Sequence, residues 1–169
     1  MSRRALLWLV PLFIALHNLE EMAFMPQMLA ELPGKIPAWV VNLLPEGVLP
    51  PSYRQFLFVL LVVTVLPYAF ALLGGARRAR GARTFLLAGA QSVMLLNVLS
   101  HVVTMNIMGS YVPGLVTALA FNLPFSLYFL GTGLRQSWLK WSDFAYLAPL
   151  AILLHGPGLF GLLALAKQW

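Results

Sequence analysis

Five long apolar runs dominate the sequence and limit what the chain can fold into. They cover residues 5–24, 55–75, 84–108, 112–133 and 144–166. Each run is close to the roughly 20 residues that an α-helix needs to cross the hydrocarbon core of a bilayer. Inside a bilayer a helix satisfies its backbone N–H and C=O groups within its own segment. We therefore predict an all-α integral membrane protein, folded as a bundle of five transmembrane helices.

The composition supports a membrane environment. Only 9% of the 169 residues are charged and 60% are hydrophobic, whereas a soluble domain carries about 25% charged residues. The five runs use most of the chain, so we predict a single transmembrane domain over residues 1–169. The first run continues to Phe24 and contains polar residues, which favours a retained helix over a cleaved signal peptide.

The basic residues predict the orientation of the bundle. Of the 11 Lys and Arg residues, eight fall on one side of the predicted spans and three on the other. The eight are Arg3, Arg4, Arg77, Arg78, Arg80, Arg83, Arg135 and Lys140. Because cytoplasmic loops carry the excess of positive charge, we predict a cytoplasmic N-terminus and an external C-terminus. The expected location is the inner (cytoplasmic) membrane of a bacterium or archaeon.

The same charge distribution bears on partners. The net charge of +6 sits in short connectors and forms no basic stripe, so we expect membrane lipids and no nucleic acid as partners. Trp138 and Trp141 are expected to anchor the bundle at the inner interface, as aromatic belts do.

The long connector from Met25 to Arg54 contains an apolar stretch, Ile36–Leu44, between two prolines. We predict a short interfacial helix in this first external connector, with Trp39 as its anchor. This helix is either a packing segment over the bundle or a lid that admits a hydrophobic ligand sideways from the outer leaflet.

Polar residues inside the predicted spans are the candidate functional residues. An ionisable group at the centre of a membrane helix costs a few kcal/mol, so each one is a hypothesis for a functional site. The three histidines of the chain lie in three different spans. The set comprises His17, Glu20, Glu21, Asn97, His101, Asn122 and His155.

Helical spacing brings these residues together in small groups. His17 shares a helix face with Glu20 and Glu21, and Asn97 shares one with His101. A rise of about 1.5 Å per residue places all of them in the central and outer-middle layers of the bundle. We therefore predict mutual pairing in the interior. Buried hydrogen bonds that only join helices remain the alternative, above all for Asn18, Gln91, Ser92, Ser100 and Thr104.

Two proline-containing segments adjoin these residues. Pro157 removes a backbone donor within the last span, which predicts a kink at His155. Tyr111 precedes Pro113 and Gly114 at the start of the fourth span, where proline is typical of helix initiation.

These residue types favour a metal-dependent intramembrane enzyme that acts on a lipid or another hydrophobic small molecule. The chain has no cysteine, so the ligands would be imidazole and carboxylate, which suit one zinc or non-haem iron ion. We expect metal ligation by His17, Glu21, His101 and His155, and catalytic roles for Glu20, Glu21 and His101. Asn97, Asn122 and Tyr111 are the candidates for orienting ligands or binding substrate.

Two other functions fit the same residues. A metal-free enzyme would use the adjacent acids, one protonated and one ionised, with His101 to isomerise an isoprenoid-like lipid. A proton-coupled small transporter or carrier would use the groups as a relay, although no internal repeat supports it. A bis-histidine haem site is a more remote reading.

The motif residues also carry a resemblance. The His17-Asn18-Leu19-Glu20-Glu21 segment, with Asn97-x-x-x-His101 on a later span and Tyr111-x-Pro-Gly after it, resembles the HXXEE membrane protein family. The resemblance extends over most of the chain, and the pentapeptide is its specific part. The family is named for its motif, so the resemblance implies a site and no particular reaction.

Overall fold

The computed structural model describes residues 1–32, 35–36, 38, 42, 46, 48–72 and 80–168. Every regular element in these residues is helical. The first three spans are continuous α-helices: α1 (Arg3–Glu31), α3 (Tyr53–Leu72) and α4 (Ala82–Met108). In the described part of the chain, five helices are long and apolar enough to cross a membrane. The predicted all-α architecture with five span-length helices is confirmed.

The last two spans are composite helices. The fourth runs from Leu115 to Arg135 as α5 (Leu115–Thr117), the π-helix η1 (Ala118–Asn122) and α6 (Leu123–Arg135). The fifth runs from Trp141 to Ala166. Its parts are the 3-10 helix η2 (Trp141–Asp143), α7 (Phe144–Leu153), the π-helix η3 (Leu154–Gly158) and α8 (Leu159–Ala166).

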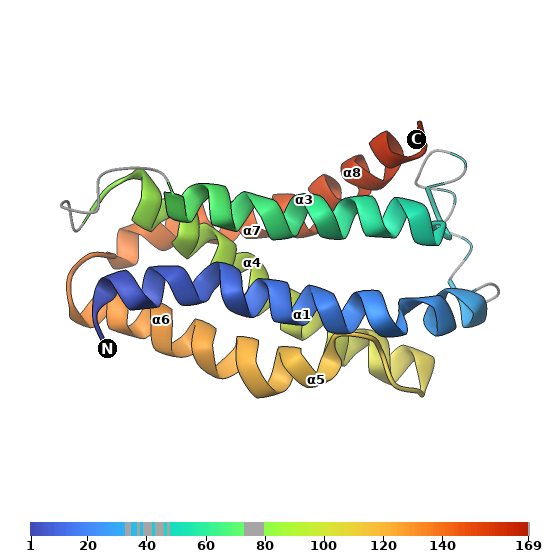
Figure 1. Ribbon diagram of the computed structural model, residues 1–169, viewed down its shortest axis with the longest axis horizontal. Helices are drawn as coiled ribbons and strands as arrows, with labels where there is room; N and C mark the ends of the chain where they lie inside the picture. The colour runs from blue at the N-terminus through green and yellow to red at the C-terminus, as the bar shows by residue number, and fades with distance from the viewer. Residues whose placement is uncertain are drawn as a thin grey trace.

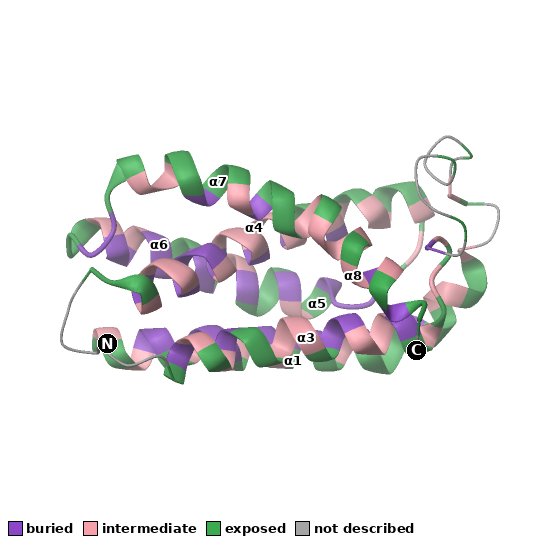
Figure 2. Cartoon of the chain, turned by 90° about the horizontal axis from the view of Figure 1, so that it is seen from above, coloured by how far each residue is buried: buried purple, intermediate pink, exposed green. Residues whose placement is uncertain are grey.

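The long helices lie side by side along the longest axis of the molecule, and the two termini lie at opposite ends (Figure 1). Helix α4 contacts α1, α3, α6 and α7, and α3 packs against α1 and α8. Large apolar side chains such as Leu61 (63% exposed), Ile107 (68%) and Leu72 (71%) face outward. Figure 2 shows such exposed residues along the outer faces of the helices, a pattern that suits contact with lipid.

The predicted interfacial helix at residues 36–44 falls largely outside the described residues, and so does its anchor Trp39. The basic connector is described only from Arg80 onward. The lid interpretation and the side of the membrane on which each terminus lies therefore stay predictions.

Both π-helical segments are explained by proline. Pro124 has no N–H to donate to the carbonyl group of the residue four positions earlier. One residue before it, the Leu123 N–H instead bonds the Ala118 carbonyl group, which is a π-type contact. The disruption predicted at Pro157 takes the same form, because η3 spans Leu154–Gly158 and contains His155. Single π turns in α-helices occur frequently at functional sites.

An apolar core fills the end of the bundle that holds the N-terminus. Leu6, Leu87 and Phe129 are completely buried in it. Trp138, expected as an interfacial anchor, belongs to this core: it is only 3% exposed and meets the Phe129 ring edge-on at 5.1 Å. Trp141, by contrast, is 78% exposed.

The predicted orientation can be measured with single cysteines, because the natural chain has none. Ser2 and Gln168 are exposed at the two ends. Ser2→Cys loses the N-cap bond from the Ala5 N–H, which is one exposed contact, so both Ser2→Cys and Gln168→Cys should still fold. In intact bacterial cells, a membrane-impermeant maleimide should label Gln168→Cys, whereas Ser2→Cys should react only after the cells are opened. The opposite labelling pattern would show that the charge count assigns the wrong orientation.

Candidate functional site

Three side chains from two helices converge in the interior of the bundle. His17 and Glu21 lie one turn apart on α1, and His101 comes from α4. The His101 Nε2 atom lies 3.3 Å from His17 Nε2 and 3.3 Å from Glu21 Oε1. The remaining distance, between His17 Nε2 and Glu21 Oε1, is 3.7 Å. We call these three residues the His/Glu cluster; the two histidines are at most 6% exposed and Glu21 is 9% exposed.

The cluster has the composition of a metal site. One ligand atom from each residue falls within 4.8 Å of the other two. Imidazole nitrogen and carboxylate oxygen are ligand types that zinc and non-haem iron accept. The sequence-based prediction grouped all three residues, and the structure brings them together.

Thr117 fixes the orientation of the His17 ring. The Thr117 hydroxyl lies 3.0 Å from His17 Nδ1 and 3.2 Å from the Gly114 carbonyl oxygen. A carbonyl only accepts, and a hydroxyl has a single hydrogen to donate. Both contacts are satisfied only if Thr117 donates to Gly114 and the Nδ1–H of His17 donates to Thr117. His17 Nε2 then presents its lone pair to the other cluster residues.

Gly114 closes the cluster from the side of α5. Its φ of +88° lies in the left-handed region, which favours glycine. A Cβ atom at this position would lie 2.7 Å from His17 Cε1, 2.8 Å from Glu21 Cγ and 2.9 Å from His101 Cε1. The absence of a side chain at Gly114 therefore lets the backbone approach all three cluster residues.

Glu20 takes a different position from Glu21. Its carboxylate accepts hydrogen bonds from the backbone N–H groups of Val116 (3.1 Å) and Thr117 (2.7 Å), and from the Tyr111 hydroxyl. The N-terminus of a helix has unpaired N–H groups that an acid can satisfy. Glu20 thus ties α1 to the start of the fourth span and holds Gly114 and Thr117 against the cluster.

Tyr111, a candidate for binding substrate, lies outside the helices and contacts Glu20 and Phe24. Its ring meets Phe24 edge-on at 5.7 Å. Burial and the hydrogen bond to Glu20 raise the pKa of Tyr111 to about 12. The hydroxyl therefore remains a donor to Glu20 throughout the physiological pH range.

His155 is not one of the three cluster residues. Its Nε2 lies 3.1 Å from the Ser100 hydroxyl, which itself donates to the Asn97 carbonyl group at 2.8 Å. The predicted fourth ligand, His155, thus contacts Ser100, the residue that precedes His101 on α4. Among the described residues the metal-type group contains only His17, Glu21 and His101.

Both asparagine candidates have buried side-chain atoms without a hydrogen-bond partner in the described residues. Asn97 has its side-chain oxygen unpaired, and Asn122 has both amide atoms unpaired, within the part of the chain that the structure describes. Asn122 is 0% exposed and lies at the end of η1.

Sequence reasoning missed the two residues that complete the site, Thr117 and Gly114. The Tyr111-x-Pro-Gly segment was interpreted as a helix start, as part of the family resemblance and as the location of Tyr111, and no role was assigned to Gly114 or Thr117. A stronger signal was available, because a threonine three residues after a glycine at a helix N-terminus is placed to bond that glycine's carbonyl group.

Comparison with known proteins identifies the family of the chain. A family model described as "Protein of unknown function with HXXEE motif" matches residues 8–129. The chain belongs to this HXXEE family. Residues 17–21 carry the motif, and the match includes all three cluster residues while ending before His155. No curated protein and no solved structure matched the chain.

Gly114→Ala should damage this HXXEE protein more than two matched glycine variants. Gly109 also has a positive φ, +64°, but nothing lies within 4 Å of an added Cβ, and the helical Gly131 is equally open. A left-handed alanine costs about 1–2 kcal/mol, and overpacking adds about 1–3 kcal/mol. The thermal unfolding midpoint should therefore be highest for Gly131→Ala, lower for Gly109→Ala and lowest for Gly114→Ala. Equal midpoints for the last two would contradict the close approach.

Glu20→Gln should destabilise the protein more than Tyr111→Phe. The amide replaces an acceptor that serves two backbone N–H groups, whereas Tyr111→Phe removes one donor to a partly exposed acid. The exposed Glu31, paired only with Lys35 in the described residues, provides the control Glu31→Gln. Thermal unfolding at pH 7 measures all three variants.

The pH dependence of Tyr111→Phe follows from the raised pKa. Because the folded-state value of about 12 exceeds the usual 10, the contact is fully present below pH 10 and is lost as the pH rises through 12. The difference from wild type should stay constant between pH 6 and about 9. A difference that vanishes by about pH 9 would contradict the Glu20–Tyr111 bond.

Proposed function

We propose that the protein is an intramembrane metalloenzyme in which His17, Glu21 and His101 bind one zinc ion and the substrate is a lipid-like molecule. The single observation that carries the proposal is the spacing of the three ligand atoms. Zinc bonds of about 2.0–2.2 Å in a tetrahedral site place neighbouring ligand atoms roughly 3.3–3.6 Å apart. The three separations in the cluster are 3.3, 3.3 and 3.7 Å.

The ligand set is one that zinc uses in proteins. Two imidazoles and one carboxylate also form the ligand set of several catalytic zinc sites, which keep a fourth position open. Zinc in such a site supplies a Lewis acid that activates water or polarises a substrate oxygen.

The protonation of His17 supports metal binding as well. With Nδ1–H directed to Thr117, the Nε2 lone pair of His17 and the Glu21 carboxylate face each other in the interior, and both lie close to His101 Nε2. Such an arrangement is costly unless a cation or a proton lies among them. Thr117 acts here as the outer partner that a metal-bound histidine normally has.

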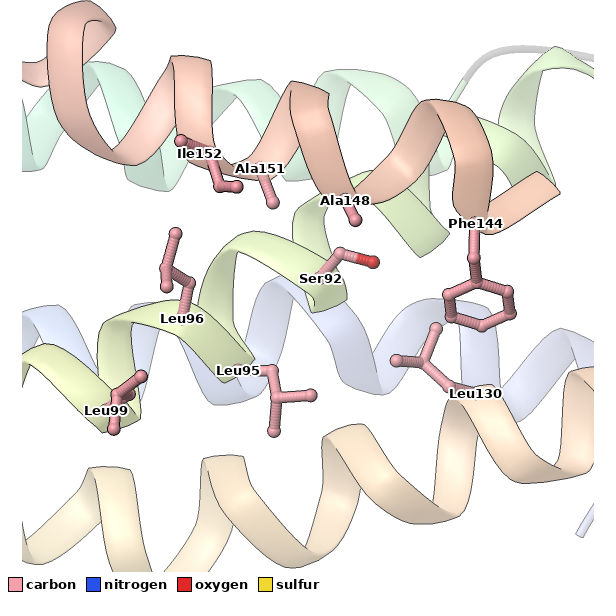
Figure 3. Close-up of a pocket in the computed structure, with 9 residues that line it drawn as sticks. All are labelled: Ser92, Leu95, Leu96, Leu99, Leu130, Phe144, Ala148, Ala151 and Ile152. Atoms are coloured by element: carbon pink, nitrogen blue, oxygen red, sulfur yellow. The ribbon is translucent and has the colours of Figure 1, made fainter. Parts of the chain in front are cut away.

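A groove nearby supports a lipid-like substrate. A pocket of about 310 Å³ lies between α4, α6 and α7 and is almost entirely apolar. Leu130 approaches Phe144 at one end of it, and Leu99 and Ile152 lie toward the other (Figure 3). Ile152 is one turn before His155, and Leu99 is next to Ser100 on α4, so this end lies near the His155–Ser100 contact. A hydrocarbon chain fits such a groove in a membrane protein.

One observation favours a metal-free acid–base enzyme as a second candidate. His101 Nε2 is equally distant, at 3.3 Å, from His17 Nε2 and Glu21 Oε1. A proton on His101 would therefore relieve the same repulsion that a metal ion relieves. In this case Glu21 and His101 form the acid–base pair, since Glu20 is bonded to the backbone of α5.

Metal analysis separates the two candidates. Protein purified without chelating resin and dialysed against metal-free buffer should retain about one zinc per chain by inductively coupled plasma mass spectrometry. His17→Ala, His101→Ala and Glu21→Gln should each lose the ion, because three protein ligands leave none to spare. Glu21→Gln should also keep or raise thermal stability in the absence of metal, since it removes a buried charge at nearly constant volume.

Two control variants sharpen the measurement. His155→Ala should retain zinc, because His155 bonds Ser100 and lies outside the three-residue group. Glu31→Gln changes an exposed acid on the same helix and should also retain zinc. Loss of the ion in His155→Ala would add a fourth ligand, and wild-type protein without stoichiometric zinc after zinc loading would favour the metal-free enzyme.

A further inference from the structure

The buried amides of Asn122 and Gln91 lack partners that buried amides normally have. Both side chains are 0% exposed. Within the described residues, neither the oxygen nor the nitrogen of the Asn122 amide has a hydrogen-bond partner, and the Gln91 nitrogen also has none. Leaving such groups unpaired is costly, and native proteins rarely do so without water or a ligand nearby.

These amides lie on neighbouring helices. Ser126 donates to the Gln91 side-chain oxygen at 2.6 Å, which joins α6 to α4. Asn122 lies one turn before Ser126, and η1 packs against both α1 and α4. Asn122, Gln91 and Ser126 therefore form a buried polar group, which we call the amide subsite.

The amide subsite continues the His/Glu cluster along the fourth span. Thr117, which bonds His17, precedes Asn122 by five residues, and the π turn of η1 keeps positions five apart on one face. The rise along the helix puts the two roughly 6–8 Å apart. On the other side, one turn beyond Gln91 and Ser126, the completely buried Leu87 and Phe129 close the interior. The polar region thus ends at the apolar core.

The available atoms define the ligand chemistry. The unpaired atoms are two N–H₂ groups and one amide oxygen, all neutral, so they suit a neutral group that both donates and accepts. A hydroxyl group does both. A carboxylate or phosphate would only accept, and its charge would be buried beside an apolar core without a counter-ion.

The apolar groove provides space for the rest of such a molecule. Leu95 lies one turn from Gln91 on α4, Leu130 lies one turn from Ser126 on α6, and both line the groove. A hydrocarbon chain in the groove would lie about one helical turn from Gln91 on α4 and from Ser126 on α6.

We propose that the amide subsite binds a hydroxyl group, and that the substrate of the His/Glu cluster is a lipid alcohol whose chain lies in the groove. The substrate assignment rests on the proposed function, whereas binding of the hydroxyl group does not. Ordered water offers the same chemistry, so the test distinguishes a lipid hydroxyl from water.

Thermal unfolding of purified protein with matched probes provides this test. At a fixed detergent concentration, 1-dodecanol should raise the unfolding midpoint of the wild type by roughly 3 °C more than dodecane does. Asn122→Leu removes the amide at similar volume and should abolish this alcohol-specific difference. Asn18→Leu is the matched control, because the Asn18 amide is buried but already bonded to Thr64 at 2.6 Å, and it should keep the difference.

A second variant tests the other amide. Gln91→Met removes the unpaired N–H₂ group at similar side-chain length, together with the oxygen that accepts from Ser126, and it should reduce the alcohol response. Zinc content, measured on the same samples, should stay at the wild-type level in both subsite variants. If the wild type binds no zinc but keeps its response to dodecanol, the metal site is contradicted and the amide subsite is not. If the wild type binds zinc but does not respond to dodecanol, the amide subsite is contradicted and the metal site is not.

Two outcomes would overturn the inference. If Asn122→Leu raises the unfolding midpoint and responds to dodecanol like the wild type, the amide is simply an unpaired group. If the wild type shows no alcohol-specific response and Asn122→Leu is destabilised, the subsite holds water only.

Discussion

The structure depends on placing His17, Glu21 and His101 together in an apolar interior. Each of these groups alone would be costly there, and mutual contact reduces that cost only if the helices approach closely. The backbone at Gly114 makes the approach possible, because no side chain separates it from the three residues. Glu20 then fixes this backbone by accepting hydrogen bonds from the backbone N–H groups of Val116 and Thr117 at the start of the fourth span. The two adjacent acids of the motif therefore have separate tasks: one faces the site and the other holds its wall.

Each of the two π turns contains a polar side chain, and each lies at or next to a proline. Pro124 is followed along the helix by regular α geometry and is preceded by the π turn that carries Asn122. Pro157 lies within the π turn that carries His155. A widened turn shifts the side chains that follow it, so each polar residue can face a neighbouring helix. The polar residues of the interior thus come both from the HXXEE motif on α1 and from the π turns η1 and η3, which the motif does not predict.

Much of the fold and half of the site follow from the sequence for definite reasons. Span-length apolar runs determine the helices, and i,i+4 spacing places His17 above Glu21 whatever the rest of the chain does. Pairing His17 with His101 also followed, because isolated charges are costly in lipid. The separation of Glu20 from Glu21, the Ser100 contact of His155 and the part played by Thr117 did not follow. Each depends on the rotation and distance of one helix relative to another, which long-range packing decides and local pattern does not. Trp138 was misplaced for the same reason, since its burial depends on packing against Phe129.

The central claim is that two imidazoles and one carboxylate surround a zinc ion inside the bundle. X-ray absorption at the zinc K-edge of the purified protein tests this most directly, because it reports ligand type and distance at the metal itself. The account predicts a four-coordinate site with nitrogen and oxygen ligands at about 2.0–2.1 Å and outer-shell scattering from two imidazole rings. In His101→Ala one imidazole contribution should disappear. A spectrum of zinc with six oxygen ligands and no imidazole scattering, as for an ion held loosely at the surface, would contradict the account.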